Sequence, residues 1–400
     1  MKQVLIALGL MLCGLMLTAA ALDPGLPSNY WESPKATDSK APHVWSKLEK
    51  DLRPEACAQC HIEQFDDWKK SLHAAAFSPG TVGQFPAMGH AGANACLNCH
   101  APLAEQEFTD YEAMSASVAL LLKHPQGFDA EADLDAKALP LTHAGVSCAS
   151  CHVRGWQRFG PPPKASGAVG VQSGPAHGGF TATRDFESSQ FCASCHQFPD
   201  SMAINGKPLE NTLSEWMASS FSKQGVTCQR CHMPNRKHQF RGIHDPEMVK
   251  KGLSFDLKQQ GDVAIFSIRS KWIGHAFPTY VTPKVIVRAE AKSSSGDSLK
   301  SWQWEIVREV EYDNGWQEKR DARLMPGETR NFIADGIPAD TSRVYYAVRV
   351  IPDNFYKGLY DDLLTGELQA QANEHISRAR KQAEKNDYLL FEQSIPLERP

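Results

Sequence analysis

Five copies of one short motif carry most of the chemistry that this sequence could perform. Each copy reads Cys-x-x-Cys-His, and the copies end at His61, His100, His152, His196 and His232. Two thiols spaced along one helical turn match the two vinyl groups of a porphyrin, and the adjacent histidine is then delivered to the iron. The attachment residues are Cys57, Cys60, Cys96, Cys99, Cys148, Cys151, Cys192, Cys195, Cys228 and Cys231. We therefore predict five covalently bound haem c groups, each holding one iron.

Two other uses of paired cysteines fit this sequence less well. Of the eleven cysteines, only Cys13 lies outside the motifs. An even number of cysteines in an exported chain suggests disulfides, but a disulfide framework has no reason to place a histidine after every pair. Structural zinc sites also combine cysteine with histidine. Because two cysteines and a directly adjacent histidine cannot easily converge on one tetrahedral ion, haem is favoured over zinc.

The second axial ligand of each iron must come from elsewhere in the chain. Fifteen histidines minus the five in the motifs leave ten candidates. We predict as ligands His73, His177, His238, His244 and His275, with His143 and His90 in reserve. The other three, His43, His124 and His375, are interpreted as structural or solvent-facing. Methionine is the other common ligand, but Met233 follows His232 too closely to reach the opposite face of the same haem.

The segment after the first motif shows how a distal histidine is recognised. Phe65, Trp68 and Leu72 recur at helical spacing before His73 and predict an apolar face suited to a porphyrin. If that helix is continuous, His73 lies about 18 Å along its axis from the histidine of the motif. That separation is too large for both to bind one iron, so we expect His73 to cap a neighbouring haem.

Two histidines follow the fifth motif within the stretch CQRCHMPNRKHQFRGIHD. We interpret His238 and His244 as ligands of other irons. If only one of them is a ligand, the other is a candidate proton donor beside an open iron. His177 lies in a loop rich in Gly and Pro that a haem could order, and His275 opens a different region of the chain.

Composition divides the chain into four parts. Residues 1–21 hold an apolar run followed by small residues, which is typical of a cleaved secretory signal; an uncleaved N-terminal anchor is the alternative. Residues 22–56 form an N-terminal extension. Residues 57–250 hold all five motifs, with so few residues between them that the haems must supply much of the buried apolar surface. Residues 251–400 contain no cysteine.

The last of these parts predicts antiparallel sheet. Segments such as DVAIFSIRS, KVIVRAEA, SWQWEIVREVEY, ETRNFIAD and RVYYAVRV alternate in polarity between turn signals, and the last places Val344, Tyr346, Val348 and Val350 on one face. A helix over about 367–386 follows. The predicted fold class is multidomain α + β: a haem-packed, mainly helical or irregular N-terminal domain, then a β-sandwich-like domain with a C-terminal helix. A cap or docking role is the simplest interpretation of that second domain.

The stretch CAQCHIEQFDDWKKSLHAAAF resembles the opening of multihaem cytochromes of the cytochrome c-552/c-554 family, in which the motif helix carries Trp and then an S-x-H-A ligand segment. Three further stretches are typical of that family, CLNCHAPLAEQ, GVSCASCHVR and EWMASSFSKQGVTCQRCHMP, as is the GH-x-x-PT segment at 274–279. The resemblance covers about residues 57–279 and supports His73, His238, His244 and His275 as ligands. It implies a periplasmic or cell-surface haem protein of respiratory electron transfer. Pentahaem nitrite reductases replace one motif histidine with lysine, and this chain does not.

Three functions fit these observations. The leading hypothesis is an electron carrier whose bis-histidine haems pass single electrons between respiratory redox partners, namely other cytochromes or a membrane quinol enzyme. The alternative is an oxidoreductase in which one open haem acts on a small nitrogen or sulfur compound. A third hypothesis makes the chain a subunit that docks to such a partner through its β-rich domain. A formal net charge of −4 argues against nucleic acid as a partner.

Overall fold

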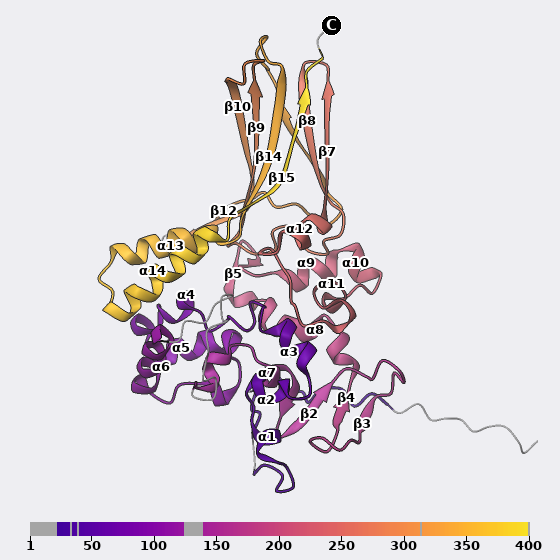
Figure 1. The fold of residues 1–400 in the computed structure, drawn as a ribbon, viewed down its shortest axis with the longest axis vertical. Helices are drawn as coiled ribbons and strands as arrows, with labels where there is room; N and C mark the ends of the chain where they lie inside the picture. The colour runs from indigo at the N-terminus through magenta and orange to yellow at the C-terminus, as the bar shows by residue number, and fades with distance from the viewer. Residues whose placement is uncertain (1–21, 33, 38–39, 124–138, 313, 399–400) are drawn as a thin grey trace, which may run out of the picture.

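The computed structural model describes residues 22–32, 34–37, 40–123, 139–312 and 314–398. The predicted signal segment 1–21, with Cys13, and His124 lie outside the described residues. Within the described ranges, no helix is long and apolar enough to cross a membrane. Short helices make up the lower body of the molecule, and long antiparallel strands rise from it as a tower (Figure 1).

The part of the chain that holds the motifs is built from short helices. They are α1 (Lys47–Lys50), α2 (Pro54–Ala58), α3 (Ile62–Trp68), α4 (Pro79–Val82), α5 (Phe85–His100), α6 (Tyr111–Lys123), α7 (Cys148–His152), α8 (Gln190–His196), α9 (Thr212–Ala218), α10 (Ser220–Lys223), α11 (Cys228–His232) and α12 (Pro246–Gly252). Motifs two to five each lie on a helix that ends at the motif histidine, and the first motif spans the junction of α2 and α3. A helical turn therefore sets the spacing of each cysteine pair.

The helix predicted to run from the first motif to His73 is not continuous. α3 ends at Trp68, whose indole Nε1 donates to the carbonyl of Val146 at 2.8 Å. This contact ties α3 to the segment before the third motif, and the chain then turns towards His73. The distance estimated from a continuous helix therefore does not apply.

Small sheets occur where the sequence indicates irregular loops. β1 (Val153–Arg154), β2 (Gln157–Gly160), β3 (Gly170–Gln172) and β4 (Phe180–Ala182) form one sheet in the order β1-β2-β4-β3, with β2 and β4 parallel. β5 (Ala203–Ile204) and β6 (Lys207–Pro208) form a short antiparallel pair. The first sheet brackets the loop that carries His177.

The tower is a two-layer sandwich of antiparallel strands. One layer has the order β10-β9-β14-β15 and the other β13-β8-β7. The strands are β7 (Leu253–Gln260), β8 (Val263–Ser270), β9 (Lys284–Lys292), β10 (Ser298–Ile306), β13 (Thr329–Ala334), β14 (Arg343–Ile351) and β15 (Tyr388–Pro396). The alternating residues predicted to share one face of β14 are all fully buried between the layers. Beside the sandwich, β11 (Arg308–Tyr312) and β12 (Trp316–Asp321) form a hairpin.

The predicted C-terminal helix exists, but it does not end the fold. α14 (Ala370–Lys385) follows a second helix, α13 (Asn354–Thr365), and β15 comes after both. The two helices leave the sandwich and cover α4 in the lower body (Figure 1). Two glycines allow this approach, because a Cβ on Gly80 would lie 2.0 Å from the Tyr360 hydroxyl and one on Gly83 would lie 2.8 Å from Ile376. The C-terminal part thus packs closely against the motif-bearing part.

Candidate haem-binding site

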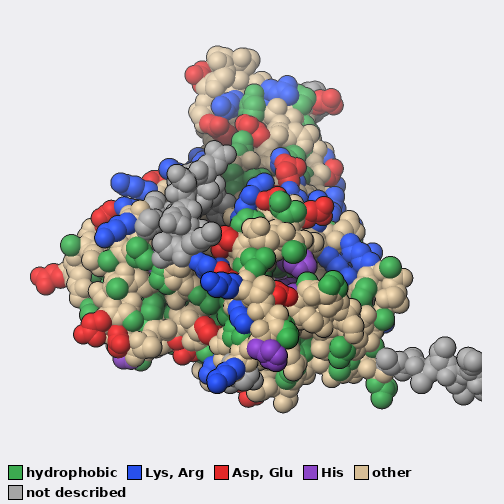
Figure 2. Space-filling model, turned by 60° about the horizontal axis from the view of Figure 1, so that its bottom comes forward, with side chains coloured by type: hydrophobic (Ala, Val, Ile, Leu, Met, Phe, Trp, Pro, Cys, Tyr) green, Lys and Arg blue, Asp and Glu red, His purple; other side chains and the backbone are tan. Residues whose placement is uncertain are grey.

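All five motifs open into one internal cavity of about 2460 Å³. Every motif cysteine and every motif histidine lines it, as do the five predicted distal histidines, His73, His177, His238, His244 and His275. Phe and Trp side chains from α3, β4 and α9 supply apolar walls. A space-filling view shows histidine side chains at the bottom of a hollow in the lower body (Figure 2). One space therefore collects both kinds of ligand that the sequence predicts.

Within this cavity, three motif histidines each face a histidine from another segment. The ring centroids are 6.2 Å apart for His73 and His196, 6.2 Å for His152 and His238, and 6.3 Å for His232 and His275. Metal–imidazole bonds of about 2 Å, plus about 1 Å from each nitrogen to its ring centre, place two rings that share one metal about 6 Å apart. These three pairs therefore have the separation that a single iron between them requires.

The tautomer of these histidines is set by their surroundings. A carbonyl oxygen only accepts, so a ring nitrogen that bonds to it must carry the proton, and this leaves Nε2 free for a metal. Six cavity histidines have Nδ1 on a backbone carbonyl at 2.6 to 3.0 Å: His100, His152, His177, His232, His238 and His275. The Nδ1 of His196 instead lies 3.0 Å from a carboxylate oxygen of Glu210.

Burial also keeps several of these imidazoles neutral, which is the form that binds a metal. Burial lowers the pKa of His73 to about 3, and it lowers the pKa of His152 and of His275 to about 4. His196 differs, since Glu210 outweighs the effect of burial and raises its pKa. In the described part of the chain, no three His, Cys, Asp or Glu side chains converge to hold an ion directly. Each of the three histidine pairs supplies two imidazoles, which is the number of axial side chains that a haem iron takes.

Two comparisons with known proteins agree with this geometry. Residues 56–120 match the family of cytochrome c554 and c-prime. The chain is similar in fold to the crystal structure of a penta-heme cytochrome c552 from Thermochromatium tepidum, with 20% sequence identity and a TM-score of 0.57 over 88% of this chain and 100% of that one. No curated protein sequence matches the chain. The chain thus resembles multihaem c-type cytochromes of the c-552/c-554 family in one matched segment and in its fold.

The first motif has its candidate partner in the loop between β3 and β4. His177 lines the same cavity as His61, and its backbone N–H donates to Glu49 at 2.6 Å. Glu49 belongs to α1 of the N-terminal extension, where it also forms a capping box with Ser46. Among the described residues, the structure gives no ring contact between His61 and His177 like those of the three pairs. The extension therefore holds the loop in place at the cavity wall.

The second motif has no imidazole opposite its histidine among the described residues. His100 points its Nδ1 to the carbonyl of Ala76 at 2.9 Å. Tyr356 of α13 lines the cavity, and burial, with smaller contributions from Asp353, Glu210 and Cys96, raises the pKa of its hydroxyl to about 12. This side of the cavity is closed by elements of the C-terminal part, which sequence reasoning did not connect to the motifs.

His244 lines the cavity with its Nε2 already occupied. That nitrogen lies 3.0 Å from Asp353 Oδ1, and the other carboxylate oxygen of Asp353 accepts from Asn386 at 2.6 Å. Nε2 is the nitrogen that the six cavity histidines with a carbonyl partner leave free. His244 thus lies in the cavity with the other predicted distal histidines, but its Nε2 is hydrogen-bonded to the carboxylate of Asp353.

The two reserve histidines lie elsewhere. His90 is exposed on α5. His143 is buried, and its Nε2 lies 2.9 Å from the Ser117 hydroxyl. Of the three histidines interpreted as structural or solvent-facing, His43 is exposed and His375 is buried with its Nε2 donating to the carbonyl of Val118 at 2.9 Å.

Cysteines of different motifs also contact one another. Three such pairs of thiols lie close enough to shift each other's pKa: Cys57 and Cys148, Cys99 and Cys195, and Cys192 and Cys228. The first motif is therefore adjacent to the third, and the fourth is adjacent to both the second and the fifth. The sequence order of the motifs is not their spatial order.

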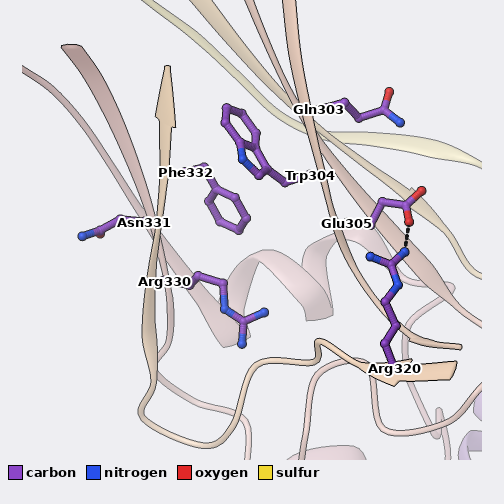
Figure 3. Close-up of a pocket in the computed structure, with 7 residues that line it drawn as sticks. All are labelled: Gln303, Trp304, Glu305, Arg320, Arg330, Asn331 and Phe332. Carbon is purple, nitrogen blue, oxygen red and sulfur yellow. Dashed lines mark hydrogen bonds and ion pairs between the residues drawn. The ribbon is translucent and has the colours of Figure 1, made fainter. Parts of the chain in front are cut away.

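A second pocket, of about 390 Å³, lies on the tower between β10 and β13. Its apolar wall is Trp304 and Phe332, and its rim carries Arg320, which pairs with Glu305 (Figure 3). It contains no histidine or cysteine, and we assign it no part in the redox chemistry.

Proposed function

We propose that this cytochrome passes single electrons between respiratory redox partners through five covalently bound haems, and that the three sites with paired histidines are bis-histidine haems. The observation that carries the proposal is the set of three histidine pairs at 6.2 to 6.3 Å, each joining one motif histidine to a ring from another segment. When bound, the haem irons supply one-electron chemistry between their ferric and ferrous states. His177 is proposed as the partner of the first motif.

The chain contributes rigidity and proximity to this transfer. Backbone carbonyls orient the imidazoles, so the ligand rings need not reorganise when the charge on the metal changes. Contacts between cysteines of neighbouring motifs bring the attachment points together, and these contacts define a route from the first motif to the third and from the fourth to the second and fifth.

The proposed location is the periplasm or the cell exterior, because c-type haem motifs and an apolar N-terminal segment occur together. The proposed partners are other redox proteins, such as cytochromes or a membrane quinol enzyme. With a net charge of −4, charge complementarity would favour a partner with a basic docking face.

Electron paramagnetic resonance of the oxidised protein, combined with a haem count, tests the proposal. We expect five haems per chain and low-spin signals from the paired sites. Near-parallel rings at His232 and His275, with 14° between their planes, should give a low-spin signal distinct from the 39° and 47° pairs. A haem count below five, or mostly high-spin iron, would contradict it.

A second function, catalysis at one open haem, is favoured by the second motif. His100 has no imidazole opposite it in the described structure, and His244 is held by Asp353. A small nitrogen or sulfur compound could bind at such a position, with His244 as proton donor. A high-spin ferric signal that integrates to about one haem in five, and that disappears on adding cyanide, would support this function. Complete low-spin ligation would exclude it.

A further inference from the structure

The histidine of the fourth motif differs from six other cavity histidines in the partner of its Nδ1. Its Nδ1 lies 3.0 Å from the Glu210 carboxylate, whereas the six other cavity histidines with an assigned Nδ1 partner donate to a backbone carbonyl. A carboxylate is a stronger acceptor than a carbonyl because the hydrogen bond is charge-assisted. An imidazole that donates to a carboxylate becomes a more basic ligand at its other nitrogen.

The position of Glu210 is structurally defined. It lies two residues after β6, its side chain is 15% exposed, and it lines the cavity. Its own carbonyl accepts from the backbone N–H of Phe198 at 2.9 Å, which ties it to the segment just after the fourth motif. Glu210 is therefore held beside His196 by the backbone.

The fourth motif is also the junction of the cysteine contacts. Cys195 lies beside Cys99 of the second motif, and Cys192 lies beside Cys228 of the fifth. An electron that moves between the second and fifth motifs by the shortest contacts therefore passes the fourth. A group that changes the basicity of His196 therefore acts at the middle of the route between the second and fifth motifs.

We propose that Glu210 sets the reduction potential at the fourth motif and makes it the lowest of the three sites with paired histidines. A more basic imidazole stabilises the ferric state relative to the ferrous state. One electron enters from a neighbouring haem and one electron leaves to another, and no bond forms or breaks. Electrons then reside on the haems of the second and fifth motifs, and they pass through the haem of the fourth motif without being stored there. This inference rests on the proposed ligation by His196, and Glu210 acts through that histidine as a positioning residue.

The test is Glu210→Gln in the full-length holoprotein, with each haem followed by redox titration monitored by optical and paramagnetic resonance spectra. Glutamine keeps the size and the hydrogen-bonding geometry but removes the charge. We expect one of the five potentials to rise, with the oxidised-to-reduced ratio of that haem falling about tenfold at fixed potential, or about 59 mV. The same haem should show altered low-spin g-values.

Glu187→Gln is the matched control. Glu187 also lines the cavity, but it pairs with Arg236 at 2.7 Å and is 43% exposed. Its loss removes one negative charge without changing an imidazole partner, so all potentials should shift slightly and together. If Glu210→Gln shifts no single haem beyond this control, the inference is wrong. If Glu210→Gln prevents haem incorporation, Glu210→Asp is used instead. It keeps the carboxylate but places it farther from His196, so the inference still requires an upward shift of one reduction potential.

The haem count and spin state separate this failure from failure of the proposed function. Five low-spin haems with unmoved potentials in Glu210→Gln would overturn only the role of Glu210. If the unmutated protein shows no low-spin signals, the histidine ligation on which the role of Glu210 depends is wrong.

Discussion

Arg323 and Glu215 form a buried ion pair that joins the β-rich part of the chain to the motif-bearing part. Arg323 Nη1 lies 2.8 Å from Glu215 Oε1, and the two side chains are 0% and 9% exposed. Glu215 lies on α9, and its other oxygen accepts from the backbone N–H of Ala276 at 3.1 Å. Glu215 therefore orients the segment that carries His275, and Arg323, which follows β12, holds Glu215 in place.

Replacing Arg323 with Met should destabilise the protein strongly. Removing one partner of a buried pair leaves an uncompensated charge, which costs about 3–5 kcal/mol. Denaturant unfolding followed by circular dichroism measures the change. Arg320→Met is the control, because Arg320 is 44% exposed and its ion pairs should contribute only about 0–1 kcal/mol. Adding Glu215→Gln to Arg323→Met should recover part of the loss; equal losses in the two single arginine variants would refute the prediction.

Acid should weaken the same interface through Asp321. Burial raises the pKa of this carboxyl, but hydrogen bonds from Arg323 and Lys207 outweigh burial and hold it well below the ordinary value of 3.8. Because the folded pKa is depressed, the stabilisation is present above about pH 4 and is lost as the pH falls through the folded pKa. Thermal unfolding from pH 6 to 2 should show a smaller acid loss in Asp321→Asn than in the unmutated protein. Parallel curves would contradict this.

Replacing His275 should change the spin state at one haem only. His275→Ala removes the ring opposite His232, so one low-spin signal should become high-spin while the haem count stays at five. His143→Ala is the matched control, since that ring is buried away from the cavity and contacts Ser117. It should leave the spectrum unchanged and cost about 1–3 kcal/mol of stability through the unpaired hydroxyl. A new high-spin signal in His143→Ala and none in His275→Ala would make His143 the ligand and His275 the structural residue.

Replacing His244 decides between its two proposed roles. Because its Nε2 is bonded to Asp353, we expect His244→Ala to leave the high-spin fraction unchanged. Paramagnetic resonance measures that fraction, and Asp353→Asn serves as a companion variant that frees Nε2 without removing the ring. If His244→Ala converts one haem to high spin, His244 is a ligand, and the open-haem function loses its proton donor.

The sequence alone predicted the haem chemistry that is proposed for this protein. Covalent attachment requires two thiols and a histidine within one helical turn, so the motif is local and is readable from adjacent residues. Alternating polarity likewise predicted most of the sandwich strands, because period-two burial is a local property of a strand facing one core. The same local pattern is weaker in β7, β12 and β15, which the prediction missed.

Only the tertiary structure decided how the histidines meet. His73, His238 and His275 are separated from His196, His152 and His232 by 43 to 123 positions in the sequence, and no local spacing predicts which of them will face each other. The cavity histidines are placed by three features of the fold: the end of α3 at Trp68, the small sheet around His177, and the packing of α13 and α14 onto α4. The role of Glu210 and the Asp353 bond to His244 depend on the same long-range packing, since hydrogen-bond partners are chosen by the fold and not by residue type.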